Sequence, residues 1–160
     1  MKTDNKPLPA NVPAEKAILG ALLLDNALYE ATKVLEPEDF SLDAHRRIFL
    51  HIAQMIERGE AVDPITLVED MREGRDLEAV GTMPVAYISD LSSDTIRYRQ
   101  SVRDWTRIVK AKSLLRKLIL SCTGAINHAY DGGSGFEIIS TLKEQINEIE
   151  NAAKRGMRTT

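Results

Sequence analysis

One long stretch of the chain contains almost nothing that would end a helix. Residues 94–130 include no proline, and Gly124 is their only glycine. At 1.5 Å per residue, this stretch has room for one or two helices totalling about 50 Å. A glycine-rich break over residues 131–135 follows, in which Ser134 and Glu137 form the capping-box pattern that begins a further helix. The chain is therefore constrained to a fold that ends in long helices.

Both of these segments carry an apolar residue at every third or fourth position. That spacing places the residues along one face of a helix. Two such stripes on either side of a short glycine turn predict an antiparallel helical hairpin, and an apolar seam of this kind favours self-association. We assign the stripes as the hairpin interface, which Lys112 interrupts at one position. The interface residues are Ile108, Leu115, Ile119, Cys122, Ile126, Ile139, Leu142, Ile146 and Ile149.

The first half of the chain contains shorter helical patterns and no sustained apolar–polar alternation that would indicate a strand. Helices are predicted over residues 13–24, over 27–35, from a cap at Ser41 to Gly59, from Asp63-Pro64 to about Gly74, and over 84–92. The expected fold class is all-α, with a compact helical head of about five short helices followed by the antiparallel helical hairpin.

Length and composition are those of an ordinary soluble domain. The 160 residues, 43% of them hydrophobic, can form a core without disulfides, and the single cysteine, Cys122, excludes an internal disulfide and a cysteine-based zinc site. No apolar run approaches the roughly 18 residues of a membrane span, and the polar N-terminus lacks a signal core, so we expect a cytoplasmic protein. The predicted parts are an extended arm over 1–12, the head over 13–93, the hairpin over 94–153, and a linker start or frayed tail over 154–160.

Patterns that carry catalysis or bind cofactors are missing from the sequence. The glycine-rich break lacks the Gly-Lys-Ser/Thr ending of a phosphate-binding loop, so we interpret it as a turn and recognise no ATP site. His45 and His51 are six residues apart, which does not bring them together as zinc ligands on a helix. We interpret His45 as a hydrogen-bonded structural histidine. The sequence thus predicts no catalytic residue, no metal and no cofactor in this chain.

The net charge of −3 is unevenly distributed. Residues 1–96 hold 9 Lys/Arg against 18 Asp/Glu, whereas residues 97–117 hold eight basic side chains and one acid. A basic helix that includes Trp105 could follow the phosphate backbone of a single-stranded nucleic acid, meet the acidic head of a neighbouring copy, or form a solvated face. The candidate nucleic-acid contacts are Arg97, Arg99, Arg103, Arg107 and Lys110.

Five blocks of the sequence agree in order and spacing with a known pattern, across about residues 7–150. They are LPANVPAEKAILGALLLD, LEPEDFSLDAHRRIFLHI, GEAVDPITL, LEAVGTMPVAYISDL and WTRIVKAKSLLRKLI. Together they resemble the N-terminal domain of the replicative DNA helicase of the DnaB type. A single block is weakly specific, but five blocks in the same order are specific.

The matching positions lie in the predicted head and at the start of the predicted hairpin. They are Glu15, Leu19, Gly20, Asp39, Phe40, His45, Ile48, Phe49, Asp63, Ile65, Thr66, Gly81, Tyr87, Ile108, Val109, Lys112, Leu115 and Arg116. The sequence departs from the family pattern at Pro13, Ser41, Thr82 and Ala111. The family often has Glu, an aromatic residue, a second glycine and an acid there, in that order. The missing acid at Ala111 makes this hairpin more basic than usual.

The resemblance implies hairpins that pair between subunits, in a collar of six copies that resembles a trimer of dimers. It also implies docking of the C-terminal helical domain of primase, contact with helicase loaders in some systems, and guidance of single-stranded DNA at the ring entrance. In this family ATP and Mg²⁺ belong to a separate RecA-like motor domain. The chain is then either the collar domain alone or a stand-alone relative without a motor.

For primase or subunit contact we select three head residues and three hairpin residues: Glu15, Asp63, Tyr87, Trp105, Arg107 and Arg116. Structural roles compete with contact for the head residues. Asp63 is also a good helix cap, Glu15 suits the N-terminal end of a helix dipole, and Tyr87 suits a core position. The leading hypothesis is an oligomerisation and primase-docking module without activity of its own. The alternative is a module that binds single-stranded nucleic acid through the basic helix over 97–117.

Overall fold

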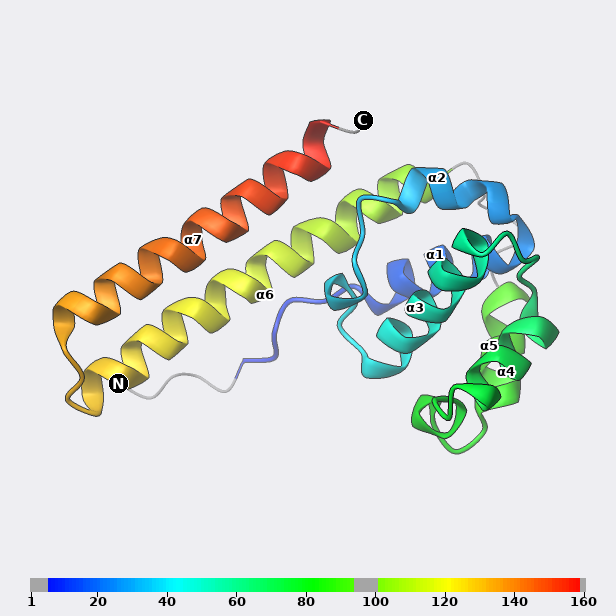
Figure 1. Ribbon diagram of the computed structural model, residues 1–160, viewed down its shortest axis with the longest axis horizontal. Helices are drawn as coiled ribbons and strands as arrows, with labels where there is room; N and C mark the ends of the chain where they lie inside the picture. The colour runs from blue at the N-terminus through cyan, green and yellow to red at the C-terminus, as the bar shows by residue number, and fades with distance from the viewer. Residues whose placement is uncertain (1–5, 94–100, 159–160) are drawn as a thin grey trace. The chain divides into compact units, whose positions relative to one another are not determined.

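The computed structural model describes residues 6–93 and 101–158, with side chains as far as Gly156. Every regular element in these residues is a helix (Figure 1), and the predicted all-α fold class is confirmed. The chain divides into a head unit, residues 11–110, and a hairpin unit, residues 1–10 with 111–160. Residues 94–100, with Arg97 and Arg99 and the first part of the predicted hairpin, lie outside the described residues.

The head unit contains one helix that is buried on most of its surface, α1 (Val12–Leu24). The side chain of Asn11 caps α1 by accepting from the N–H of Ala14 at 3.0 Å, and Pro13 lies in the first turn, where a proline removes no helical hydrogen bond. Eight of its 13 residues are buried, because α1 packs against both α3 (Asp43–Glu57) and α5 (Pro84–Ser93). A helix with apolar residues on most sides is stable only in such a position.

The helix α3 is amphipathic and turns its apolar face toward the core. Ile48, Phe49, Ile52 and Met55 are buried, at the spacing of one helix face. The ring of Phe40 packs on that of Phe49 with their centroids 4.8 Å apart. Between α1 and α3 the chain forms three short elements, η1 (Asn26–Leu28), α2 (Tyr29–Thr32) and η2 (Pro37–Asp39).

The beginning of α3 corrects one prediction. The N-cap residue is Leu42 rather than Ser41, and no side chain caps this end of the helix. The backbone N–H of Ser41 instead donates to the carboxylate of Glu15 at 2.8 Å. The backbone of Ser41 is therefore held by a buried carboxylate from a distant part of the sequence, and the serine side chain does not cap α3.

The helix α4 (Pro64–Glu73) begins and ends where the sequence predicts. Oδ1 of Asp63 accepts from the N–H groups of Ile65 and Thr66 at 2.8 and 2.9 Å, and the Thr66 hydroxyl accepts from the N–H of Asp63. Gly74 is the C-terminal cap. The short helix η3 (Leu77–Val80) then leads to α5.

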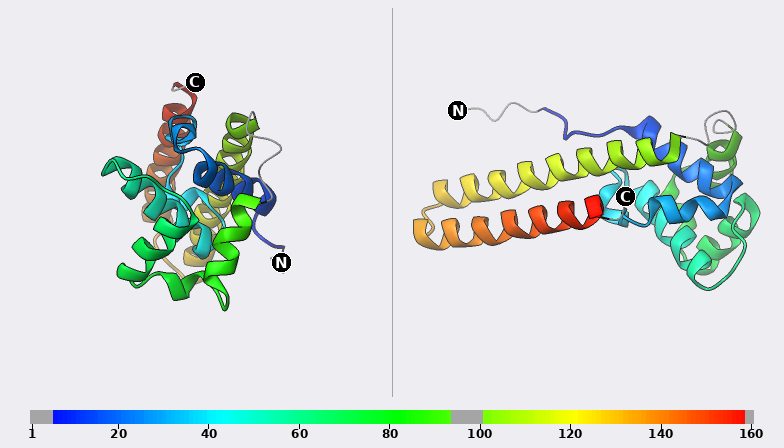
Figure 2. Two further views of the ribbon diagram at one scale, coloured as in Figure 1. Left: turned by 90° about the vertical axis from the view of Figure 1, so that its right-hand side faces the viewer. Right: turned by 90° about the horizontal axis from the view of Figure 1, so that it is seen from above.

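The two longest helices are α6 (Val102–Tyr130) and α7 (Gly135–Arg158). They run antiparallel and side by side in the views of Figures 1 and 2, so the predicted helical hairpin is present. Gly132 in the turn has a φ of +81°, a left-handed conformation that favours glycine. Ser134 immediately precedes α7, at the position predicted for a cap.

Replacing Asp63 by alanine should lower the free energy of unfolding by about 1 kcal/mol, because two N–H groups of α4 lose their acceptor. Urea unfolding followed by circular dichroism measures the loss. A matched control is Glu69→Ala on the same helix, whose carboxylate is exposed and paired with Arg72. That change should cost less than about 0.5 kcal/mol, and equal losses in the two variants would contradict the capping role.

Candidate interaction surfaces

The hairpin carries a stripe of apolar side chains that the chain leaves uncovered. Six of the nine predicted interface residues are 38 to 55% exposed, namely Ile108, Leu115, Ile119, Ile126, Ile139 and Ile146. The other three, Cys122, Leu142 and Ile149, are half-buried. No described side chain of α7, over residues 135–156, is buried. An apolar face of this length is typical of a protein–protein contact rather than of a solvated surface.

A buried polar cluster joins three helices of the head unit. Glu15 of α1 and His45 of α3 are 1% and 0% exposed, and Nδ1 of His45 lies 2.6 Å from Oε2 of Glu15. The other ring nitrogen, Nε2, lies 2.6 Å from the hydroxyl of Tyr87 in α5. The interpretation of His45 as a hydrogen-bonded structural residue is confirmed. Glu15 faces the interior, so a partner could not touch it in this conformation, which corrects its selection as a direct contact.

The cluster also changes the acidity of its members. Burial by itself would raise the pKa of Glu15, but the hydrogen bonds from His45 and Ser41 outweigh burial and lower the pKa below its ordinary value of 4.5. Burial, together with the charge of Glu15, raises the pKa of Tyr87. The ammonium of Lys16 lies 5.4 Å from the centre of the Tyr87 ring. Glu15 is therefore an ionised acceptor, and Tyr87 is a neutral hydroxyl at the half-buried edge of the cluster.

Three of the selected contact residues lie where a partner could reach them. Asp63 is exposed at the start of α4, although its carboxylate also caps that helix. Trp105 is half-buried against the core of the head unit. Arg107 is the most accessible of the three, with a side chain that is 75% exposed and paired with Asp104 at 3.2 Å.

Two candidate cations are engaged within the fold instead, Arg116 of the selected contact residues and Lys110 of the candidate nucleic-acid contacts. Arg116 is 7% exposed, and its Nη1 donates to the carbonyl of Pro9 at 2.9 Å, within the hairpin unit. In the head unit, Nζ of Lys110 lies 2.8 Å from the buried carboxylate of Asp39 and 3.0 Å from the carbonyl of Val34. Breaking the pair of Lys110 and Asp39 to bind a partner would leave the buried carboxylate without this partner. Arg116 is itself buried, so the structure corrects the prediction of an external contact for both side chains.

The candidate nucleic-acid contacts are thus divided by the structure. Arg103 and Arg107 are exposed on α6, whereas Lys110 is engaged in the head unit. Arg97 and Arg99 lie outside the described residues. The described part of the basic stretch therefore presents fewer free cations than the sequence suggests.

Three further features were sought in the described residues: a pocket, a metal site and a membrane-spanning helix. A shallow hollow at the hairpin turn is lined by His128, Asp131, Ser134, Glu137 and neighbouring residues. Over residues 6–93 and 101–158, no group of three or more His, Cys, Asp or Glu side chains is arranged to hold a metal ion. Across the same residues, no helix is both long enough and apolar enough to cross a membrane.

The helical head and its hairpin match known proteins. Residues 7–111 match the family model described as the DnaB-like helicase N terminal domain. The chain belongs to this family. The resemblance based on five sequence blocks is thereby confirmed.

Relatives in the family are whole replicative helicases. The chain is 34% identical over 148 residues to the replicative DNA helicase DnaB of Geobacillus stearothermophilus, with 92% of this chain and 32% of the relative covered. It is 32% identical over 143 residues to the replicative DNA helicase DnaC of Bacillus subtilis, with 88% of this chain and 31% of the relative covered. The chain therefore spans about a third of the length of these helicases.

Two solved structures share the fold of this chain. The crystal structure of the N-terminal domain of DnaB helicase from Mycobacterium tuberculosis aligns with a TM-score of 0.77 at 26% identity, over 89% of this chain and 99% of that one. A structure described as a DnaB-like replicative helicase and its interactions with primase aligns with a TM-score of 0.69 at 23% identity, over 89% of this chain and 31% of that one. The second likeness establishes the fold alone.

Sequence reasoning missed the polar contacts between distant segments. The pair of Lys110 and Asp39 joins residues 71 positions apart, and the Arg116–Pro9 contact joins residues 107 positions apart. Helical spacing identifies which residues share a face, but it does not identify a partner on another element.

Replacing Glu15 by glutamine should lower the free energy of unfolding by about 2 kcal/mol at neutral pH, because a charged acceptor of buried donors is lost. The pKa of Glu15 is lower in the folded chain than its ordinary value of 4.5. The ionised carboxylate therefore stabilises the fold fully at pH values above that ordinary pKa, and this contribution is lost as the pH falls through the pKa of the folded state. Urea unfolding from about pH 7 to about pH 4 should show the difference between variant and parent shrinking in acid.

The control for that series is Glu30→Gln, whose carboxylate is 75% exposed and paired with Lys33. This change should leave stability nearly unaltered at every pH. A gap between Glu15→Gln and parent that stays constant down to the lowest pH would contradict the assigned ionisation of Glu15.

Proposed function

We propose that this chain is the collar module of a replicative helicase, which mediates ring oligomerisation and docks primase, with helicase loaders as further partners in some systems. The exposed apolar stripe of α6 and α7 is the observation that carries the proposal. The family assignment and the absence of catalytic patterns in the sequence support a scaffold rather than an enzyme. In this proposal, ATP and Mg²⁺ belong to a motor domain of the complete helicase.

Self-association through the hairpin follows from the physical chemistry of the stripe. Isoleucine and leucine side chains recur at three- and four-residue steps on both helices, and most are more than a third exposed. Removing such side chains from water stabilises a complex by about 25 cal/mol for each Å² of apolar surface. A second copy offers the same stripe, which makes a symmetric pairing of hairpins the simplest way to cover both surfaces.

The dimer should dissociate when a charge is placed on the stripe. Ile119→Asp or Ile146→Asp would bury an unpaired carboxylate at the interface, and we expect the dissociation constant to rise at least about a hundredfold, or about 2.8 kcal/mol. Sedimentation velocity and multi-angle light scattering measure the assembly. Circular dichroism confirms that each variant is folded, since both positions are exposed in the single chain.

The matched control is Leu120→Asp, next to Ile119 on α6. Leu120 is 58% exposed, but the 100° step between successive helical residues places it outside the stripe. This variant should assemble like the parent. If Ile119→Asp keeps the mass of the parent, the hairpin is not the interface.

Primase docking is assigned to the exposed members of the selected set. A related helicase of the same fold is described by its interactions with primase. In this chain Arg107, Asp63 and the accessible edge of Tyr87 can meet a partner. Trp105, two residues before Arg107, is half-buried. Glu15 and Arg116 act indirectly in this proposal, because their charges are buried within the fold.

Calorimetric titration of the chain with the C-terminal helical domain of primase from the same organism tests docking directly. We expect saturable binding near physiological salt, and Arg107→Ala should weaken it about tenfold, because the proposal places that arginine at the contact. The control is Arg72→Ala, an exposed arginine at the end of α4. Absence of binding by a folded, oligomeric chain would contradict docking and leave an oligomerisation or loader-contact module.

Binding of single-stranded nucleic acid remains the alternative hypothesis. It rests on Arg103 and Arg107 among the described residues, because Lys110 is held by Asp39. Phosphate contacts by such cations give strongly salt-dependent binding, which would distinguish this function from a protein-docking role.

A further inference from the structure

An exposed lysine of α1 lies over an aromatic ring of α5. The ammonium of Lys16 is 5.4 Å from the centre of the Tyr87 ring, within the range of a cation–π contact. Lys16 is exposed, whereas Tyr87 is half-buried and its hydroxyl lies 2.6 Å from Nε2 of the buried His45. The cation and the accessible edge of the ring therefore stand together on the surface of the head unit, where α1 packs on α5.

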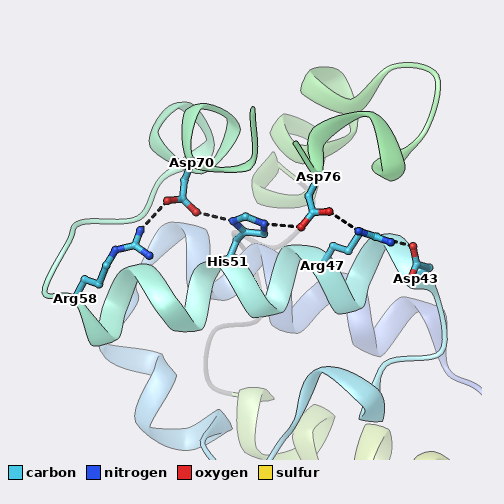
Figure 3. Close-up of polar contacts among 6 residues, drawn as sticks. All are labelled: Asp43, Arg47, His51, Arg58, Asp70 and Asp76. Atoms are coloured by element: carbon cyan, nitrogen blue, oxygen red, sulfur yellow. Dashed lines mark hydrogen bonds and ion pairs between the residues drawn. The ribbon is translucent and has the colours of Figure 1, made fainter. Parts of the chain in front are cut away.

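The charge of Lys16 is not matched by a neighbouring acid. Arginines on and next to α3 show how the head unit pairs other cations (Figure 3). These pairs are Arg47 with Asp43 and Asp76, and Arg58 with Asp70. Among the residues that the structure describes, no carboxylate lies within ion-pair distance of the Lys16 ammonium. Its neighbour Glu15 is 1% exposed and is engaged by Ser41 and His45.

A second lysine over a tyrosine, elsewhere in the head unit, has the acid that Lys16 lacks. Lys33 lies 6.0 Å from the centre of the Tyr29 ring, and its ammonium is 2.6 Å from the carboxylate of Glu30. The chain itself thus supplies the carboxylate beside this ammonium. The two arrangements share the cation and the ring, and they differ in whether the cation already has an anionic partner.

The surface beside Tyr87 also offers an accessible apolar side chain. Met83, directly before α5, is 70% exposed. Its carbonyl accepts from the N–H of Tyr87 at 3.0 Å, so the two residues are one helical turn apart. Methionine is unbranched and flexible, which lets it adapt to the shape of a partner. A cation, an aromatic edge and a flexible apolar side chain together suit a carboxylate that stands next to an apolar residue.

We infer that Lys16, Tyr87 and Met83 form a docking site for a helix of the partner that carries an aspartate or glutamate beside an apolar residue. The inference rests on the proposed docking function and takes the C-terminal helical domain of primase as that partner. Lys16 pairs with the carboxylate, while Met83 and the edge of Tyr87 contact the apolar side chain. Because acids outnumber cations in residues 1–96, an unpaired cation also fixes where on the head such a carboxylate can bind.

Calorimetric titration of the chain with the C-terminal helical domain of primase from the same organism, at low and at near-physiological salt, tests the site. Lys16→Gln should weaken binding about tenfold at low salt, because the carboxylate of the partner loses its cation. Its affinity should also fall less steeply with salt than that of the parent. Lys16→Arg keeps the charge and can stack on the ring, so it should bind within about threefold of the parent. Circular dichroism confirms that each variant is folded.

Matched controls use a second lysine and a second apolar residue. Lys33→Gln removes a lysine whose charge is already paired, and it should bind like the parent. Met83→Ser should weaken binding about fivefold. Val85→Ser should not, because Val85 is 48% exposed but lies about 200° around α5 from Met83.

Two results would overturn this site while leaving primase docking in place. One is an unchanged affinity in Lys16→Gln, and the other is an equal loss in Lys16→Gln and Lys33→Gln. A failure of Lys16→Arg to restore binding would also contradict the ion pair. Absence of binding by the folded parent chain would instead contradict the docking function, and this site with it.

Discussion

The fold of the head depends on burying one carboxylate inside an apolar helix. Glu15 stands among the buried residues of α1, where an unpaired charge would be very costly. It is tolerated because the N–H of Ser41 and the ring of His45 reach it, and His45 in turn reaches Tyr87. These contacts fix α1, α3 and α5 relative to one another.

The two units differ in how completely they bury their own apolar faces. In the head, the apolar faces of α1 and α3 are buried and the cations at Arg47 and Lys110 have acidic partners. In the hairpin unit, the apolar stripe of α6 and α7 remains exposed. A unit that completes its core can act as a rigid platform, whereas an uncovered stripe requires a partner. This contrast is the physical basis for assigning self-association to the hairpin and docking to the head.

Membership of the DnaB-like helicase N-terminal domain family is consistent with that division. The family model covers residues 7–111, which include the head and the first part of α6, whereas the exposed part of the stripe continues to Ile146. The head residues that match the family pattern are largely buried, as Glu15, His45 and Asp39 illustrate. Such residues preserve the platform, while exposed side chains such as Arg107 are available to contact a partner.

Local chemistry in the sequence determined the helices, their caps at Asp63 and Gly74, and the apolar faces, because helix formation depends on residues three or four positions apart. It also determined the family, through five blocks in order. Only the tertiary structure decided which charges are internal. Lys110 and Arg116 look like surface cations in the sequence, yet each meets an oxygen from a segment 71 or more positions away. Pairing across that separation depends on how the helices pack, which periodicity does not encode.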